Sequence, residues 1–443
     1  MPALKQEDGK GGFYLVLAAL LFEFGRPQDA IPGLGGIPIP SVLDGLILLN
    51  VLTSGKLSLA NIQTRLWAPL LALMALHVPI ATNNFWALMT LKDMMFYLCL
   101  YLGVITYVNT LERFKILVNM WLGVHVVLAI QGILHGGVGI GGWLGDENDF
   151  CMAINMAVPF AFFLVFRKTS GVQKVVYLAI LCLFILTAMT TLSRGGFIGL
   201  AAVGFYAWLR SSKKGAALVV VGIVVAFMIL FAPDKYWDEV RSTTSDETME
   251  IGTGGERLYT WGIGWEMFVG NPILGIGQSN FAWTFAEYQG DRTFNDKSIA
   301  GRAAHSLYFT LLPELGLVGV AIFGLMMVQN FRDVAFVKRC EKASSDKVAT
   351  GGMRVPPPVT DPFLLASACE ASLIGYLVSS VFITTLYYPS VWVMTGFIVA
   401  LANMAVESSS QSDGKTGNLR RKHSVAFPAW SRVSRAQSGK AVL

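Results

Sequence analysis

Arg194 is the first of three side chains whose type and setting suit chemistry on a phosphate group. It lies in the sequence Ser193-Arg194-Gly195-Gly196, at the junction of two apolar segments. A guanidinium group beside glycine backbone at a membrane surface can bind phosphate through two parallel hydrogen bonds. The alternative is an arginine that only extends its charge from an apolar helix into water. The sequence leaves both interpretations open.

Arg257 is the second candidate. It begins an amphipathic stretch and follows Gly254, Gly255 and Glu256. Unpaired N–H groups make the N-terminus of a helix a favourable place for an anion. Arg257 is therefore a second candidate contact for phosphate. The alternative is a salt bridge between Arg257 and Glu256 or another acid of the same segment.

His305 is the third candidate, and it lies where an apolar segment begins, three residues after Arg302. Histidine is the side chain best suited to proton transfer near neutral pH. His77 and His125 lie within apolar segments, and we expect them to be structural. His305 differs from them because it adjoins a large polar loop and a second basic residue.

The remaining polar motifs give weaker indications. The run Asp146-Glu147-Asn148-Asp149 lacks the spacing and the glycine of a calcium loop, and we interpret it as a polar turn before a helix. Gly275 and Gly277 are not followed by the lysine of a phosphate-binding loop. The five cysteines show no C-x-x-C spacing, which favours buried thiols. We expect no metal site and no cofactor.

The composition places these candidates in a membrane protein. Of 443 residues, 54% are hydrophobic and 14% are charged, against about 25% charged in soluble domains. This composition excludes disordered, collagen-like and soluble globular proteins. The apolar runs are continuous and close to the length of a membrane-spanning helix, whereas the strands of a β-barrel alternate over about 10 residues. The fold class is therefore an all-α polytopic membrane protein.

The apolar runs predict about twelve transmembrane helices. They lie at residues 12–24, 37–53, 66–82, 88–108, 114–134, 150–166, 175–192, 195–209, 215–232, 303–328, 363–386 and 388–406.

The basic residues predict the orientation of these helices. If the N-terminus lies in the cytoplasm, every loop on that side is basic, and these loops hold most of the 34 lysines and arginines. An even number of spans also places the C-terminus in the cytoplasm. We interpret the net charge of +5 in this way and not as nucleic-acid binding. The basic residues that topology leaves unexplained are Arg26, Lys92, Arg194, Lys235, Arg241, Arg257, Arg292, Lys297 and Arg302.

The polar segments divide the chain into four parts. Residues 1–232 hold the first nine spans, and 233–302 form one large outer loop between spans nine and ten. In this loop Leu258, Trp261, Trp265 and Phe268 recur at helical spacing, which predicts an amphipathic helix in the membrane interface. Residues 303–406 hold the last three spans with a cytoplasmic linker at 329–362. The tail at 407–443 is polar, and we expect it to be disordered.

The ordered set of motifs resembles the O-antigen ligase/polymerase superfamily of bacterial glycan-transfer enzymes. The resemblance rests on Ser193-Arg194-Gly195-Gly196, on Arg257 with Trp261, on Asn271 to Gly277, on His305-Ser306 and on Glu314-Leu315-Gly316. Asp146 to Phe150 and Phe24 to Gln28 are also similar. No single motif is strong, and the specificity comes from their order along most of the chain.

The resemblance implies a metal-independent glycosyltransferase of the GT-C type in the bacterial inner membrane, with its active site facing the periplasm. The implied donor is a glycan on undecaprenyl pyrophosphate, and the acceptor is lipid A–core in the ligase branch or another lipid-linked glycan in the polymerase branch. The matching positions assign the pyrophosphate to Arg194 and Arg257, and the acceptor hydroxyl to His305. We also expect substrate contacts from Arg302, Arg292, Arg26 and Glu314.

The residues themselves favour a similar reaction. Cleavage of a sugar–pyrophosphate bond places negative charge on the leaving group, and two fixed arginines would stabilise that charge as it develops. His305 would accept a proton from the acceptor hydroxyl or align it by a hydrogen bond. Because the leaving group needs no protonation, we expect one displacement with inversion of configuration.

Several alternatives remain open at this point. A ligase is favoured over a polymerase because the chain has one large outer loop, whereas these polymerases often have two. A protein O-oligosaccharyltransferase is a third possibility. A transporter of lipid-linked glycans would instead place its cations near the middle of the bilayer. A structural membrane subunit would show no activity of its own.

Overall fold

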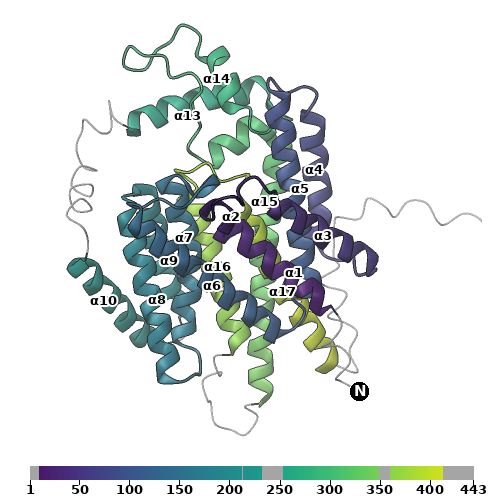
Figure 1. The fold of residues 1–443 in the computed structure, drawn as a ribbon, viewed down its shortest axis with the longest axis vertical. Coiled ribbons are helices and arrows are strands. Elements are labelled where there is room, and N and C mark those ends of the chain that lie inside the picture. The colour runs from purple at the N-terminus through teal and green to yellow at the C-terminus, as the bar shows by residue number, and fades with distance from the viewer. Residues whose placement is uncertain (1–8, 212, 232–252, 349–359, 413–443) are drawn as a thin grey trace, which may run out of the picture.

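The computed structural model describes residues 9–211, 213–231, 253–348 and 360–412. Within these ranges the regular structure is helical, apart from one isolated bridge between Phe294 and Lys297. The helices form a bundle with α13 and α14 lying across one end (Figure 1). Residues 233–252 of the expected outer loop and 413–443 of the expected tail lie outside the described residues.

The described helices have the following bounds. They are α1 (Lys10–Leu20), the π-helix η2 (Leu21–Gly25), α2 (Pro27–Ala30), α3 (Ile39–Thr53), α4 (Ile62–His77), α5 (Asn84–Tyr107), α6 (Leu111–Leu134), the 3-10 helix η3 (Gly142–Leu144), α7 (Glu147–Val165), α8 (Gly171–Thr190), α9 (Arg194–Arg210), α10 (Lys214–Phe231), α13 (Thr253–Gly270), α14 (Phe281–Gln289), α15 (Tyr308–Val348), α16 (Asp361–Ser379) and α17 (Pro389–Ser412).

The prediction of an all-helical polytopic membrane protein is confirmed for the described part of the chain. Seven described helices are long and apolar enough to cross a membrane, namely α5, α6, α7, α8, α15, α16 and α17. Two shorter apolar helices, α3 and the part of α10 at Lys214–Ile223, lie at the positions of two other expected spans. The count of twelve and the GT-C assignment stay predictions.

Several boundaries differ from those predicted. The helix α17 runs to Ser412, so the first residues of the tail expected at 407–443 are helical and not disordered. The span expected at 303–328 begins as a helix only at Tyr308. Residues 303–307 precede the helix, and their backbone forms hydrogen bonds with Trp261 and Ser380. The helix then continues to Val348, so the first part of the expected linker at 329–362 is helical. The apolar pattern ends before the helix does because a helix that leaves the bundle can continue with polar residues.

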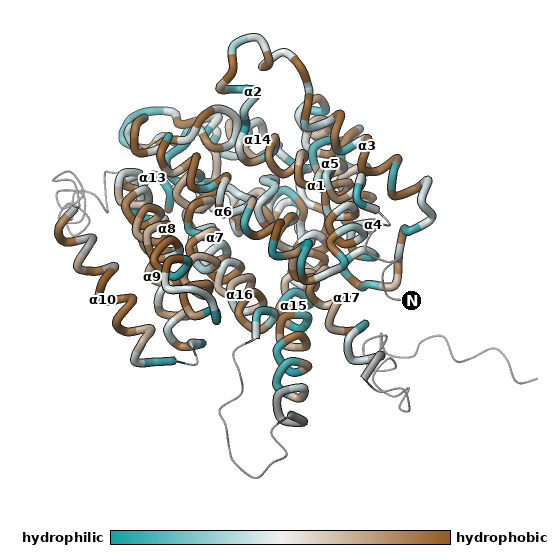
Figure 2. Tube along the Cα trace, turned by 60° about the horizontal axis from the view of Figure 1, so that its bottom comes forward, coloured by the Kyte–Doolittle hydropathy of each residue, from teal (hydrophilic) through white to brown (hydrophobic). Residues whose placement is uncertain are grey.

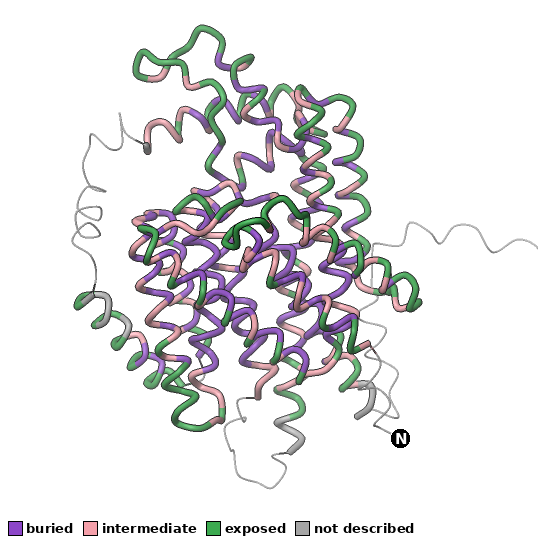
Figure 3. Tube along the Cα trace, in the orientation of Figure 1, coloured by how far each residue is buried: buried purple, intermediate pink, exposed green. Residues whose placement is uncertain are grey.

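The centre of the bundle is formed by α7, α16 and α17, which are mostly buried (Figure 3). Small residues allow α7 and α9 to approach closely. A Cβ atom added on Gly196 would lie 2.2 Å from the Cys151 sulfur. The Asn155 side-chain amide donates to the Gly196 carbonyl at 2.7 Å. A buried polar contact of this kind fixes the register of two apolar helices that would otherwise slide.

The basic loops meet at the opposite end of the bundle from α13. Lys115 and Arg167 both pair with Asp361, at 2.8 and 3.0 Å. Arg210 and Lys338 both pair with Glu370. The loops that the charge pattern assigns to one side are thus neighbours in space. Which side of a membrane they face stays a prediction.

The helix α13 is amphipathic, but its packed face differs from the one predicted. Leu258 and Trp265 are exposed, as an interfacial helix requires. Trp261 is instead stacked on Phe309 of α15, with ring centroids 4.9 Å apart. The predicted face joined Trp261 to the exposed stripe because spacing alone does not show which neighbours a helix meets.

A backbone clamp joins the end of α13 to α15. The helix α15 is broken at Gly316, and its freed backbone groups pair with residues 272–277. Ile276 N–H donates to the Pro313 carbonyl at 2.9 Å, and Leu317 N–H donates to the Pro272 carbonyl at 2.9 Å. Gly275 lies directly against this break. The clamp fixes α13 and α14 on the bundle.

Substitution of Gly275 by alanine tests this clamp. Gly275 has φ +86°, and an added Cβ would lie 2.5 Å from the Glu314 carbonyl. We expect the free energy of unfolding to fall by about 2–4 kcal/mol, from strain at positive φ and from overpacking. Gly33→Ala is the matched control because Gly33 has φ +90° and no atom within 4 Å of an added Cβ. Equal melting temperatures for the two variants in detergent would contradict the clamp.

Candidate functional site

The candidate site lies at the α13 end of the bundle. It is built from the N-termini of α7, α9 and α13, from residues 302–307 and from the turn between α16 and α17. These segments are far apart in the sequence, and the bundle brings them to one end (Figure 1).

Arg194 is the first residue of α9, and its backbone is held on both sides. The Ser193 hydroxyl accepts a hydrogen bond from Gly196 N–H at 3.0 Å and donates to the Asn148 side chain at 2.7 Å. Ser193 is thus a helix N-cap that also ties α9 to α7. An added Cβ on Gly195 would lie 2.9 Å from Cβ of Phe382. The start of α9 is therefore fixed by its neighbours, and Arg194 itself is half-buried.

The predicted polar turn at residues 146–149 is confirmed as the cap of α7. The Asp146 carboxylate accepts from the backbone N–H of Asn148 at 2.8 Å and of Asp149 at 3.3 Å. Asp149 in turn accepts from the Tyr388 hydroxyl at 2.8 Å. Asp146 of this turn lies near enough to Arg257 and His305 to raise the pKa of both groups.

Arg257 lies in the first turns of α13 and faces the start of α9, because Arg257 and Gly195 both lie against Phe382. Its guanidinium carbon lies 6.0 Å from the ring centroid of Phe382. Its pKa is lowered, mainly because the group is partly buried and also because of the positive charge of Arg194, while Asp146 and Glu256 act in the opposite direction. Two like charges therefore face the same small region, and such a pair favours a ligand of at least two negative charges.

His305 is held in a strained backbone conformation between two buried residues. It has φ +45°, and its neighbours Ala304 and Ser306 are buried. The Ala304 carbonyl accepts from the Trp261 indole at 2.8 Å, and Leu307 N–H donates to the Ser380 carbonyl at 2.8 Å. Positive φ at a non-glycine residue persists only where the surroundings enforce it.

The charges around His305 favour its neutral form. Its pKa is lowered by partial loss of hydration, then by Arg257 and by Arg302, against the opposite effects of Asp146 and Glu256. The ordinary histidine pKa is about 6.5, so the imidazole is neutral near pH 7. A neutral imidazole can accept a proton from a hydroxyl group.

Glu256, which was the alternative partner for Arg257, forms an ion pair with a different arginine. The Glu256 carboxylate lies 2.9 Å from Nε of Arg302, which is exposed. Arg302 therefore lies beside both α13 and His305. The pair also draws the negative charge of Glu256 toward Arg302.

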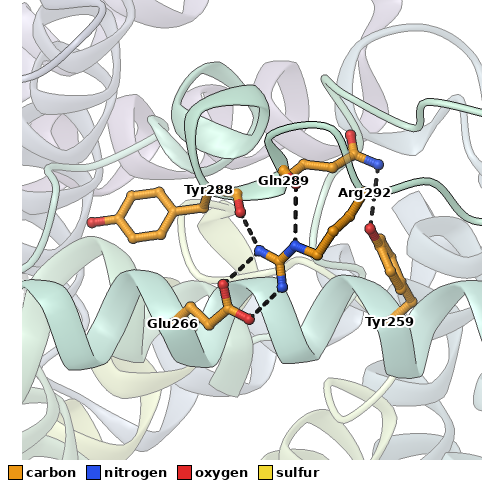
Figure 4. Close-up of polar contacts among 5 residues, drawn as sticks. All are labelled: Tyr259, Glu266, Tyr288, Gln289 and Arg292. Carbon is orange, nitrogen blue, oxygen red and sulfur yellow. Dashed lines mark hydrogen bonds and ion pairs between the residues drawn. The ribbon is translucent and has the colours of Figure 1, made fainter.

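The other expected substrate contacts, Arg292, Arg26 and Glu314, have local partners. Arg292 donates to both oxygens of Glu266 at 2.7 Å and to the Gln289 carbonyl at 3.2 Å (Figure 4). Arg26 pairs with Asp29 at 2.5 Å. None of these three is among the charges that act on His305.

Glu314 is buried and joins three segments. Its carboxylate accepts from Ser279 N–H at 2.8 Å, from Phe281 N–H at 2.9 Å and from the Tyr387 hydroxyl at 2.7 Å. These contacts hold the backbone before α14 against α15 and α17. Glu314 thus positions the segment that follows the clamp.

Sequence reasoning missed Tyr387 and Tyr388. They lie in the turn where two expected spans, 363–386 and 388–406, nearly meet. The available signal was the run Thr384-Thr385-Leu386-Tyr387-Tyr388 before Pro389, in which hydroxyl groups interrupt an apolar segment. The run does not stand out in the sequence because its composition is still apolar on average.

The site as a whole gathers positive charge and one neutral imidazole at the end of a membrane bundle. Arg194, Arg257 and Arg302 supply the positive charge, and His305 lies among them. Within the described ranges no group of three histidine, cysteine, aspartate or glutamate side chains is arranged to hold a metal ion. The arrangement can bind a polyanionic group and accept a proton beside it.

Fold and site together define a polytopic helical membrane protein with arginines and a histidine gathered at one end of the described bundle. Residues 177–324 match the family model described as O-Antigen ligase, over about a third of the chain. This match confirms the resemblance to the O-antigen ligase superfamily, whose members are lipid-linked glycan transferases in general. The matched region includes Arg194, Arg257, His305 and Glu314. No curated protein matches the chain.

Substitution of Glu314 by glutamine tests its role in holding the site together. The amide keeps the size of the side chain but replaces one accepting oxygen by an NH2 group, which cannot accept the hydrogen bonds that this oxygen receives, and a buried donor left without its acceptor costs about 1–3 kcal/mol. We expect a lower free energy of unfolding, by about 2–4 kcal/mol, measured by thermal unfolding in detergent. Glu287→Gln in α14 is the control because Glu287 is exposed. Similar behaviour of both variants would remove Glu314 from this role.

Proposed function

We propose that the protein is an O-antigen ligase-like glycosyltransferase. It moves a glycan from undecaprenyl pyrophosphate to an acceptor at the periplasmic face of the inner membrane, with lipid A–core as the favoured acceptor. The observation that carries this proposal is that Arg257 and the start of α9, which carries Arg194, both lie against Phe382, with His305 near enough for Arg257 to lower its pKa. The match over residues 177–324 supports the class of reaction.

The two arginines fit the diphosphate of the donor. A pyrophosphate ester carries charge on both phosphoryl groups, and guanidinium groups bind such oxygens in pairs. When the sugar–oxygen bond breaks, further negative charge develops on the leaving diphosphate. Arg194 and Arg257 would stabilise this charge from fixed positions, and the proposed mechanism uses no metal ion.

His305 fits the acceptor side of the same reaction. Its neutral imidazole would accept the proton of the acceptor hydroxyl while that oxygen bonds to the anomeric carbon. The electron pair of the broken bond leaves with the diphosphate. One displacement of this kind inverts the configuration at the anomeric carbon.

The position of the site supports transfer at a membrane surface. Arg194, Arg257 and Arg302 lie at the α13 end of the bundle, whereas a transporter would place its basic residues near the middle of the bilayer. The exposed apolar residues Leu258 and Trp265 on α13 suit contact with lipid at the level of the headgroups. A donor whose lipid lies in the bilayer would then present its diphosphate beside Arg257.

The polymerase remains the second candidate because it shares the donor and the reaction. The two differ only in the acceptor. In a deletion strain, core without polymer and with polymer retained on undecaprenyl pyrophosphate would indicate a ligase. Core that carries a single repeat would indicate a polymerase, and an unchanged lipopolysaccharide ladder would contradict lipopolysaccharide as the product of either reaction.

Alanine substitutions at Arg194, Arg257 and His305 test the assignment of roles. Loss of one fixed donor to a developing charge typically costs about 10²–10³ in rate, and we expect a loss of that order for each arginine. Loss of a general base costs about 10²–10⁴. Transfer is measured with purified protein in detergent or vesicles, at matched protein levels.

Arg65→Ala is the control for removal of an arginine because Arg65 is exposed and lies outside the site. Transfer at the wild-type rate by any of the three site variants would remove that residue from the mechanism.

The pH dependence of transfer tests the role of His305. Arg302→Gln removes a positive charge that lowers the pKa of His305, so this pKa rises. Activity requires the neutral imidazole, and the acid limb of the rate profile should therefore move to higher pH. Arg292→Gln is the control, since Arg292 is likewise paired with a glutamate but is not among the charges that act on the pKa of His305. A shift of the limb to lower pH, or an equal shift in the control, would contradict this assignment.

A further inference from the structure

Two adjacent tyrosines at the start of α17 reach different sides of the candidate site. Tyr387 donates to Glu314 at 2.7 Å, and Tyr388 donates to Asp149 at 2.8 Å. Both hydroxyl groups thus end on a carboxylate. The two carboxylates belong to helices that are separate in the sequence, α15 and α7.

The contact of Tyr387 leads to Arg257. Glu314 accepts from the backbone of Ser279 and Phe281, which follow the clamped segment 272–277. The same segment continues directly from α13, which carries Arg257 near its other end. Tyr387 therefore helps to fix the unit that contains α13 and α14 on the bundle.

The contact of Tyr388 leads to Arg194. Asp149 lies in the first turn of α7, next to Asn148. Asn148 accepts from the hydroxyl of Ser193 at 2.7 Å, and Ser193 caps the helix that Arg194 begins. Tyr388 also packs against Trp143, with ring centroids 5.5 Å apart. Tyr388 is thus two hydrogen bonds from the N-cap of α9.

The turn that carries the tyrosines is itself well fixed. Tyr388 N–H donates to the Thr385 carbonyl at 3.1 Å, and the Tyr376 hydroxyl donates to the same carbonyl at 3.1 Å. The Trp392 indole donates to the Leu386 carbonyl at 3.1 Å. These hydrogen bonds fix the turn and therefore hold the two tyrosine side chains at a constant separation.

Fixation matters here because the two arginines repel each other. Arg257 and the start of α9 both lie against Phe382: the guanidinium carbon of Arg257 is 6.0 Å from the ring centroid, and a Cβ added on Gly195 would lie 2.9 Å from Cβ of Phe382. Burial is the main cause of the lowered pKa of Arg257, and the positive charge of Arg194 acts in the same direction. Like-charge repulsion favours a larger separation of the two guanidinium groups, which the packing of their helices must oppose. A diphosphate is bridged best when both groups are already in place, since no reorganisation is then needed.

We propose that Tyr387 and Tyr388 are positioning residues that set the separation of Arg257 and Arg194 for the diphosphate of the donor. This inference rests on the proposed function of the site. Tyr387 acts through Glu314 on the side of Arg257, and Tyr388 acts through Asp149 on the side of Arg194. Neither tyrosine takes part in bond making or breaking.

The test uses the phenylalanine variants of both tyrosines in the full-length protein. Each variant removes one hydroxyl and keeps the ring. The assay measures transfer from a synthetic undecaprenyl pyrophosphate-linked glycan to purified lipid A–core, with kcat and KM determined separately. Tyr101→Phe is the control, because Tyr101 is buried more deeply than either tyrosine and its hydroxyl contacts Thr64 at 2.9 Å in another part of the bundle.

We expect kcat to fall about tenfold in each variant, as for loss of one buried hydrogen bond, with a smaller change in KM. Tyr388→Phe should lower the rate much less in an Arg194→Ala background than in the wild type, because its effect passes through Arg194. Tyr387→Phe should behave in the same way in an Arg257→Ala background. In the crossed pairs, Tyr388 with Arg257 and Tyr387 with Arg194, the fold losses in rate of the two single variants should multiply.

The outcomes separate this inference from the proposed function. If the wild-type protein transfers nothing, the proposed function fails. If the wild type transfers and both variants match Tyr101→Phe, the positioning role fails. Full multiplication of effects within the pairs Tyr388–Arg194 and Tyr387–Arg257 would also overturn it. Should Tyr388→Phe not fold, Asp149→Asn, which weakens the same contact from its other side, takes its place in the cycle.

Discussion

The backbone clamp between residues 272–277 and the break in α15 is the constraint on which the rest of the site depends. It converts a connection outside the main bundle into a rigid extension of α15, because two stretches of backbone satisfy each other's polar groups. Gly275 and Gly316 permit this contact, since a side chain on either would meet the opposite backbone. The carboxylate of Glu314 then continues the same connection by side-chain contacts.

The opposite wall of the site depends on small residues and helix caps. Ser193 and Asp146 each satisfy the first N–H groups of a helix, and each cap also lies in contact with a neighbouring segment. Caps of this kind place the helix N-termini side by side without relying on apolar packing, which has little direction inside a membrane. The site is thus assembled from polar contacts at the end of a bundle whose interior is apolar.

The sequence predicted the membrane class and the position of most helices, because long apolar runs report burial or lipid contact directly. It also indicated Arg194, Arg257 and His305, which topology alone did not explain. It failed for Trp261 and for Tyr387 and Tyr388, whose partners are distant in the chain. It also did not distinguish Arg292, whose charge is met by Glu266, from Arg302, which lies beside His305. Such differences depend on tertiary contacts, and a single sequence does not contain them.

The length of α15 has a practical consequence. Beyond the break at Gly316 the helix continues to Val348, and at a rise of about 1.5 Å per residue this part extends for about 48 Å, against roughly 30 Å for the hydrocarbon core of a bilayer. Its last turns project beyond the neighbouring helices (Figure 2). A helical fusion partner joined in phase near Val348 would continue this axis and move with the bundle. The resulting particle would have a rigid feature outside the detergent micelle, which is what image alignment in electron microscopy requires of a small membrane protein.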